Sequence, residues 1–206
     1  MIIRSLSDIL IDLQDHIKGE TITLKGLLDI FHERGFGFFL FIFSLPAALP
    51  VPAFGLNAVI ALPLLLLTSQ QAIGRHTIWI PAKWHKKTLS KKTIDGFVQS
   101  ADPWIKRLEI FIRPRLGSIT QGVTSNLIGV LGFMMALAVA IPLPLTNTVP
   151  SFGIAMMAIG VLMRDGLAVI VGALIGTTWV CLLVTFVIVY GPEGFDMAKE
   201  FIKGLF

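Results

Sequence analysis

The sequence predicts an all-α integral membrane protein with two proline-broken helical hairpins, one long transmembrane helix and amphipathic helices at the membrane interface. Hydrophobic residues make up 54% of the 206 residues and charged residues 15%, and the mean hydropathy is +0.80. The hydrophobic residues form long runs, which are typical of membrane helices. Two runs contain a Pro-x-Pro, at Pro50/Pro52 and Pro142/Pro144. Because proline fixes φ and lacks an N–H, a helix cannot continue unbroken through either site.

The alternation of hydrophobic and charged stretches divides the chain into six segments. They are N-terminal amphipathic helices (1–34), a first membrane hairpin (35–75), a basic cytoplasmic linker with an amphipathic helix (76–123), a second membrane hairpin (124–165), a transmembrane helix (166–190) and an amphipathic C-terminal tail (191–206). The lipid bilayer is therefore the first partner that the sequence predicts.

Two short amphipathic helices are expected before the first hydrophobic run. Residues 5–18 place their Leu and Ile side chains on one helical face. A second helix over residues 24–33 follows the capping candidates Thr21 and Thr23 and ends before Gly35. These helices could lie in the membrane interface or cover the cytoplasmic mouth of the core.

The first hairpin is expected to consist of two short helices, over residues 36–49 and 54–68. The first of them would be about 21 Å long at about 1.5 Å per residue. A bilayer core of about 30 Å requires about 20 residues. The short arms fit a re-entrant hairpin as well as a tight pair of spanning helices.

The second hairpin is expected over residues 124–140 and 151–163, and a long helix follows over residues 167–190. The long helix would extend for about 36 Å, which is enough to span a bilayer with some tilt. It contains Gly172-x-x-x-Gly176. Two small residues at this spacing permit the close approach of a neighbouring helix.

The linker between the hairpins is strongly basic. Residues 74–123 contain ten Lys and Arg but three Asp and Glu. The positive-inside rule places this linker, and with it the N-terminus, in the cytoplasm of a multi-pass protein, so nucleic-acid binding is not needed to explain the charge. Trp79 and Trp84 beside lysines form the expected interfacial belt. Residues 104–112 are expected to form an amphipathic helix.

The two proline breaks have similar surroundings. Ala53-Phe54-Gly55-Leu56 follows the first break, and Ser151-Phe152-Gly153-Ile154 follows the second after a polar insert. Either the halves form an internal repeat, such as the inverted repeats of secondary transporters, or the prolines only make turns at the far membrane face. The sequence does not decide between inverted and parallel halves. In a repeat, we expect a substrate site where the breaks meet.

Polar residues beside the hydrophobic runs are the candidates for a substrate or ion pathway. They are Asn57, Gln71, Arg75, Thr146, Asn147, Arg164 and Asp165, while the residues expected to break helices are Pro50, Pro52, Pro142, Pro144 and Pro150. A charged pair between apolar helices indicates a functional site, because charge at membrane depth is costly. Alternatively, Asp165 lies at the N-terminus of the last helix, where the dipole favours a carboxylate. The amides could line a cavity or cap broken helices.

Catalytic motifs are missing from the sequence. It contains no Gly-x-Ser-x-Gly, no phosphate-binding loop and no His, Cys, Asp and Glu at metal-ligand spacing. The single cysteine, Cys181, rules out a disulfide framework. We therefore expect no metal, no cofactor and no enzymatic activity.

Several motifs resemble the exopolysaccharide-synthesis ExoD family. They are Gly55-Leu56-Asn57-Ala58, Pro63-Leu64-Leu65-Leu66-Leu67, Gln71 with Gly74-Arg75, Trp79-Ile80-Pro81, Glu109 with Arg113-Pro114-Arg115-Leu116, Ile141-Pro142-Leu143-Pro144 with Asn147 and Pro150, and Arg164-Asp165-Gly166. The resemblance as a whole extends over about residues 24–190. The chain departs from the pattern at Ala53-Phe54, where a glycine-rich turn is expected. The resemblance implies a bacterial inner-membrane protein linked to exopolysaccharide production and alkaline-stress tolerance, without a defined molecular activity.

Two functions are compatible with these observations. The first is a small transporter or channel-like protein, dimeric because so few helices make a thin enclosure, that passes a proton, an ion or an anionic solute with Arg164 as the anion's partner. Asp165 is the only carboxylate in the apolar part of the chain, which weighs against a proton relay. The second is an accessory subunit that scaffolds the exopolysaccharide synthesis or export machinery through its interfacial helices and basic linker.

Overall fold

The computed structural model describes most of the chain. The described residues are 17, 19–31, 35–48, 56–92, 94–96, 98–99, 112–141, 147–191 and 197. The side chains of all of these residues are described except those of residues 56–58. The prolines of both Pro-x-Pro sites lie outside these residues. So do all but residue 112 of the expected helix over residues 104–112, all but residue 17 of the expected helix over residues 5–18, and most of the C-terminal tail.

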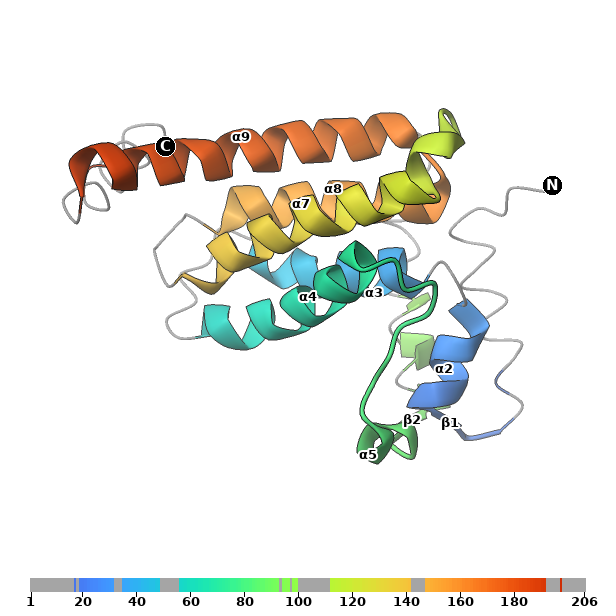
Figure 1. The fold of residues 1–206 in the computed structure, drawn as a ribbon. Coiled ribbons are helices and arrows are strands. Elements are labelled where there is room, and N and C mark those ends of the chain that lie inside the picture. The colour runs from blue at the N-terminus through green and yellow to red at the C-terminus, as the bar shows by residue number, and fades with distance from the viewer. Residues whose placement is uncertain are drawn as a thin grey trace.

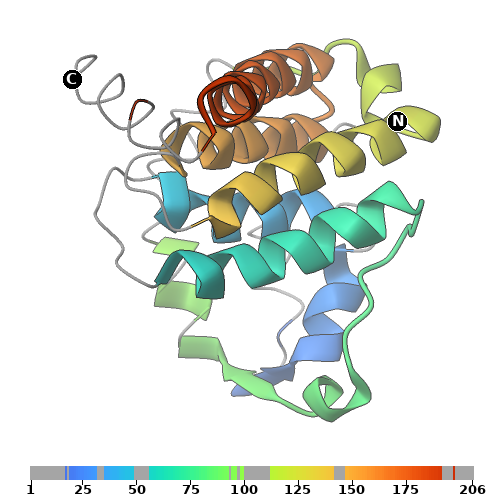
Figure 2. The same cartoon turned by 60° about the vertical axis from the view of Figure 1, so that its left-hand side comes forward.

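Five helices lie side by side and form the main body of the protein (Figures 1 and 2). They are α3 (Gly35–Ala48), α4 (Leu56–Ala72), α7 (Val123–Ala140), α8 (Thr148–Met163) and α9 (Gly166–Tyr190). Helix α8 packs between α3 and α9, and α4 packs on α7. The helices of the first pair therefore contact those of the second, and the main hydrophobic core lies between the pairs.

The helices expected on either side of each proline break are present, with two differences at their ends. Helix α4 continues to Ala72, four residues beyond the predicted end. Helix α8 begins at Thr148, so the prediction that Pro150 breaks a helix is wrong. Pro150 is the third residue of α8, where an N–H would have no partner inside the helix, so proline is tolerated there.

The outer surface of the bundle is apolar, as a surface in contact with lipid must be. Helices α7 and α9 are long and apolar enough to cross a membrane, and only 33% and 28% of their spanning windows are buried in the protein. A core helix of a soluble protein would be mostly buried. Large exposed hydrophobic residues include Val59, Leu62 and Leu66 of α4, Leu127, Val130 and Leu137 of α7, and Leu174, Leu182 and Ile188 of α9. This exposed surface and the composition indicate a membrane protein.

The Gly172-x-x-x-Gly176 motif lies at a close helix contact, as predicted. It faces Gly153 of α8, where an added Cβ would lie 2.9 Å from the carbonyl oxygen of Gly172 and 2.9 Å from the Cα of Gly176. No side chain fits between the two backbones, and α9 packs along α8 as a consequence.

A small polar unit beside one end of the bundle contains two strands, which the all-α prediction missed (Figure 1). Strand β1 (Thr21–Thr23) pairs antiparallel with β2 (Thr88–Ser90), and α5 (Ala82–His85) precedes β2. Each strand has only three residues, which is too short for a recognisable alternating pattern. The pairing joins the N-terminal segment to the basic linker.

The helix expected near residues 24–33 is present as α2 (Leu24–Phe31). The hydroxyl of Thr23 accepts a hydrogen bond from the N–H of Gly26 at 3.1 Å, which confirms Thr23 as its cap. Phe31 stacks on Phe38 of α3 with ring centroids 4.0 Å apart. Helix α2 therefore packs against the end of the bundle, which agrees with the second of the two placements considered for it.

Candidate functional site

A polar cavity of about 260 Å³ lies at the end of the bundle where α3 and α7 begin and where α4 and α8 end. Its lining residues are Phe36, Gln71, Gly74, Arg75, His76, Thr120, Gln121, Gly122, Ser125, Asn126, Val161 and Arg164. They come from both helix pairs and from the two ends of the basic linker. We call this space the basic cavity.

Among the residues that the structure describes, those lining the basic cavity carry positive charge and include no carboxylate. Arg75 is exposed just beyond α4, next to His76, and Arg164 is half-buried at the end of α8. Gln71, Ser125 and the other neutral polar groups add hydrogen-bond donors and acceptors. This combination suits an anion, which guanidinium groups bind through charge-assisted hydrogen bonds.

Arg164 reaches the basic cavity because the chain turns sharply between α8 and α9. It adopts the left-handed conformation, with φ 54° and ψ 35°, and its N–H caps the last carbonyls of α8. This conformation costs a residue other than glycine about 1–2 kcal/mol. Strain of this kind often accompanies a functional role.

Gln71 forms the inner wall of the basic cavity. Its side chain is 3% exposed, and its Nε2 donates to the Ser125 Oγ at 3.3 Å. Its Oε1 is buried and has no hydrogen-bond partner among the described residues. Gly74 packs on the side chain of Asn126 nearby. An unpaired buried acceptor at the wall of a cavity indicates a place for a ligand or a water molecule.

Three of the seven predicted pathway residues meet in the basic cavity: Gln71, Arg75 and Arg164. Asn147 does not join them, because it is buried at the opposite end of α8. Thr146 and the side chain of Asn57 lie outside the described residues. The structure therefore brings three of the predicted residues together and leaves Asp165 and Asn147 outside the cavity lining.

Several cavity residues were not predicted as site residues. His76 and Gln121 are in polar segments, where the sequence pattern does not distinguish a cavity wall from ordinary surface. Ser125 lies near the start of α7, and the neighbouring Asn126 was expected either to line a cavity or to cap a broken helix. Their spacing to Gln71 in the sequence is too large for any local pattern to connect them.

Asp165 is the N-cap of α9 and not a lining residue of the basic cavity. Its Oδ1 accepts from the N–H groups of Leu167 and Ala168, at 3.0 and 3.3 Å. Its Oδ2 accepts from the N–H of Arg113 at 3.0 Å and from the Arg115 Nε at 3.4 Å. The carboxylate is 1% exposed. These bonds agree with the capping alternative rather than with a charge that lines a pathway.

The basic cavity and the proline breaks lie at opposite ends of the helices. The breaks follow the C-terminal ends of α3 and α7, whereas the cavity is at their N-terminal ends. The 18 residues of α7 separate the two ends by about 27 Å. The expectation of a site between the breaks concerns residues that the structure does not describe.

The position of the cavity also decides how the two helix pairs are oriented. Phe36 near the start of α3 and Ser125 near the start of α7 line the same cavity, as do Gln71 and Val161 near the ends of α4 and α8. Both pairs therefore begin and end on the same side. An inverted arrangement of the halves is wrong, and an internal repeat, if the halves share one origin, is parallel.

Comparisons with known proteins agree on one family. The model of the family described as "Exopolysaccharide synthesis, ExoD" matches residues 6–185. An uncharacterized protein of Synechocystis sp. strain PCC 6803, slr1875, is 33% identical over 200 residues, which cover 93% of this chain and 94% of that protein. The protein ExoD of Rhizobium meliloti is 30% identical over 170 residues, which cover 81% of this chain and 70% of that protein. No solved structure shows significant similarity.

Proposed function

The chain belongs to the exopolysaccharide-synthesis ExoD family, and on that premise we propose that it binds and transports an anionic solute connected with exopolysaccharide production. The observation that carries the proposal is the basic cavity, in which Arg75, His76 and Arg164 come together and in which no described lining residue is a carboxylate. We propose the bacterial inner membrane as its location.

The chemistry of the lining residues supports a small anion with polar substituents. Arg75 and Arg164 can each present several N–H donors to a carboxylate or a phosphate group. The amide of Gln71 and the hydroxyls of Ser125 and Thr120 suit neutral hydroxyl groups. A cavity of about 260 Å³ is slightly below the usual range for drug-sized ligands, about 300–1,000 Å³. A phosphate or an acidic monosaccharide is of suitable size.

The surroundings of Asp165 favour an anionic solute over a proton. Both of its oxygens already accept hydrogen bonds, two of them from the first turn of α9. Asp165 therefore serves as a cap and does not line the basic cavity, so the described lining residues lack the carboxylate that a proton relay usually requires. Asp165 instead holds the junction that places Arg164 at the basic cavity.

The orientation that we propose follows from the charge of the linker. Gly74, Arg75 and His76 at its start and Thr120 to Gly122 at its end line the basic cavity. The positive-inside rule places this linker in the cytoplasm. The basic cavity would then load or release its solute on the cytoplasmic side. We also propose that the protein contributes to alkaline-stress tolerance and that it forms a homodimer.

Binding of an anion in nanodiscs tests the proposal. The Arg75→Gln variant should bind glucuronate or inorganic phosphate about tenfold more weakly, because it loses a charge-assisted hydrogen bond worth about 1.5 kcal/mol. Isothermal titration calorimetry measures the change. Lys83→Gln is the control, since it removes an exposed positive charge that does not line the cavity. Equal affinity in the two variants, or no binding by the wild type, would contradict an anion site at Arg75.

Transport requires a separate measurement. Wild-type protein in liposomes should take up the anion that binds best, and Arg164→Gln should lower the uptake more than Arg75→Gln, because Arg164 is the more buried of the two. Binding without uptake would leave an anion-sensing protein and would exclude a transporter for that anion.

The polar unit of β1, β2 and α5 favours a second candidate function, an accessory subunit of the exopolysaccharide machinery. Trp84 is 50% exposed in this unit, and the Lys87 Nζ lies 5.3 Å from its ring centroid. Exposed Trp is enriched at protein interfaces, and Trp beside Lys is also typical of the membrane–water interface. If Lys86→Gln with Lys92→Gln abolished exopolysaccharide production in cells while Arg75→Gln did not, the accessory function would replace transport.

A further inference from the structure

The basic linker exposes two tryptophans just beyond the end of α4. Trp79 is 56% exposed and Trp84 is 50% exposed. The Oε1 of Gln70 accepts from the N–H of Trp79 at 2.7 Å, and the Nε2 of Gln70 donates to the Trp79 carbonyl at 3.1 Å. The N–H of Trp84 donates to the carbonyl of Pro81 at 2.8 Å. Both exposed indoles are therefore attached to backbone that hydrogen bonds hold in place.

The stretch of chain that carries these tryptophans is positively charged. Residues 73–92 contain six Lys and Arg and no Asp or Glu, and Asp95 follows three residues later. The Lys87 Nζ lies 5.3 Å from the centroid of the Trp84 ring, where the ring face attracts a cation. The exposed lysines on either side of Trp84 in the chain are Lys83, Lys86 and Lys87. We call these three lysines, Trp79 and Trp84 the linker surface.

The linker surface lies to one side of the bundle. Figures 1 and 2 show α5 and the two strands displaced across the direction of the helix axes, and the segment over residues 73–81 joins them to the end of α4. Helices α7 and α9 are long and apolar enough to cross a membrane. When they do, this end of the bundle lies at the head-group layer, and a unit beside that end lies over the neighbouring lipids.

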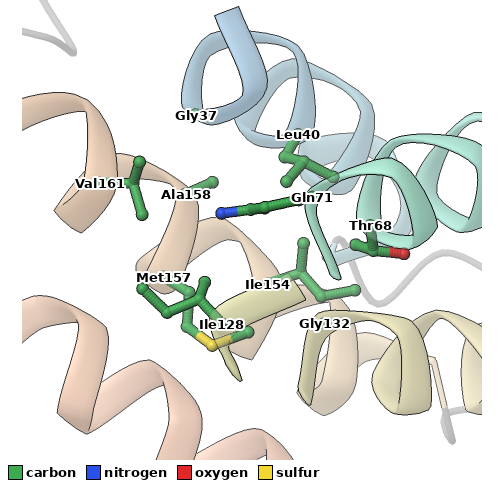
Figure 3. A pocket seen from close by; sticks show the side chains of 10 residues that line it. All are labelled: Gly37, Leu40, Thr68, Gln71, Ile128, Gly132, Ile154, Met157, Ala158 and Val161. Atoms are coloured by element: carbon green, nitrogen blue, oxygen red, sulfur yellow. The ribbon is translucent and has the colours of Figure 1, made fainter. Parts of the chain in front are cut away.

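The exposed side of α4 leads toward the linker surface. Val59, Leu62 and Leu66 share one helix face and are each more than half exposed, and Ile73 beyond the helix is 72% exposed. Between the helix pairs, described side chains such as Leu40 line a space of about 10 Å³ (Figure 3), which holds about one water molecule. An acyl chain therefore fits along the outside of α4 and not in that space.

We propose that the linker surface binds the head group of an anionic phospholipid whose acyl chains lie along the exposed face of α4. The lysine ammonium groups would pair with the phosphate, and the tryptophans would lie at the boundary between head groups and acyl chains. Charge complementarity and the adjoining apolar face of α4 favour a lipid over a protein partner. The linker surface does not line the basic cavity, so this inference is independent of the proposed transport function.

Native mass spectrometry of the full-length protein in detergent tests the lipid site. The protein is titrated with phosphatidylglycerol, which is anionic, and with phosphatidylcholine of the same acyl chains, which is zwitterionic. Phosphatidylglycerol should bind at least about fivefold more tightly, the fold-change that corresponds to about 1 kcal/mol from a single lysine. Equal affinity of the wild type for the two lipids would overturn the proposal.

Variants of the linker surface show whether its charge causes the preference. Replacing Lys83, Lys86 and Lys87 together with glutamine should abolish the preference for phosphatidylglycerol, and the exposed positions leave the fold intact. Arginine at the same three positions keeps the charge and should keep the preference. Lys25→Gln is the matched control, because it removes an exposed charge of α2 outside the linker surface. An unchanged preference in the glutamine variant, or a loss in the arginine variant or the control, would overturn the site.

Two further outcomes separate the lipid site from the other functions. If the two lipids bind equally while Lys86→Gln with Lys92→Gln abolishes exopolysaccharide production, the linker surface binds a protein and the lipid site fails. If the lipid preference holds but Arg75→Gln does not alter anion binding, the lipid site stands and the proposed anion function fails.

Discussion

Replacing Gly129 with alanine is expected to separate α4 from α7 and to destabilise the protein by about 3 kcal/mol or more, at the upper end of the range for overpacked cores. An added Cβ on Gly129 would overlap the backbone N of Ala72 and lie 2.6 Å from the backbone C of Gln71. A backbone atom cannot rotate away as a side-chain end can. The methyl group therefore fits only if the two helices move apart.

The same displacement should damage the candidate site. The last turn of α4 positions Gln71 and the following Arg75, so moving it changes the wall of the basic cavity. Thermal unfolding and size-exclusion chromatography in detergent measure the loss of stability. Gly96→Ala is the matched control, because a Cβ added there would meet no atom within 4 Å and the backbone needs no positive φ. Equal melting temperatures for the two variants would show that the α4–α7 contact is looser than described.

Replacing Asp165 with alanine is expected to lower the free energy of unfolding by about 3 kcal/mol. Loss of the cap on α9 accounts for about 1 kcal/mol. The N–H of Arg113 would be left without its acceptor, which costs a further 1–3 kcal/mol or about 2 kcal/mol on average. The ion pair with Arg115 adds little, because that side chain is 48% exposed.

Asp165→Asn separates the contributions of capping and charge. Asparagine is a good N-cap and keeps one carbonyl oxygen, so it should retain the bonds from Leu167 and Ala168. It presents an amide NH₂ toward Arg113, so we expect about half of the loss seen with alanine. Chemical denaturation of both variants in the same detergent measures the difference. An asparagine variant as unstable as the alanine variant would contradict the capping explanation.

The bonds of Asp165 connect two motifs that are 50 residues apart in the chain. Gly166 donates its N–H to the carbonyl of Arg115 at 2.7 Å, and Arg115 and Asp165 form an isolated parallel bridge. The Arg113-Pro114-Arg115 and Arg164-Asp165-Gly166 motifs, which carried part of the resemblance to the ExoD family, therefore form one structural junction. This junction fastens the end of the basic linker beside Arg164.

The sequence predicted the apolar helices because their signal is local. A run of apolar residues determines a membrane helix through the free energy of burying side chains in lipid, and neighbouring helices change its boundaries only slightly. The ranges of α3, α4, α7, α8 and α9 thus follow from composition and length. The strands β1 and β2 could not be predicted, since each is stable only when paired with the other.

By itself the sequence determined that the chain is a helical membrane protein with a basic linker, and it identified Gln71, Arg75 and Arg164 as polar residues beside apolar runs. Only the tertiary structure decided that these three residues share one cavity, that Asp165 caps α9 and that the helix pairs are parallel. The physical reason is that hydropathy acts along the chain, whereas a cavity depends on which helix ends meet. The helices pack through backbone contacts at glycines such as Gly129 and Gly153. The sequence pattern does not show which helix each of these glycines contacts.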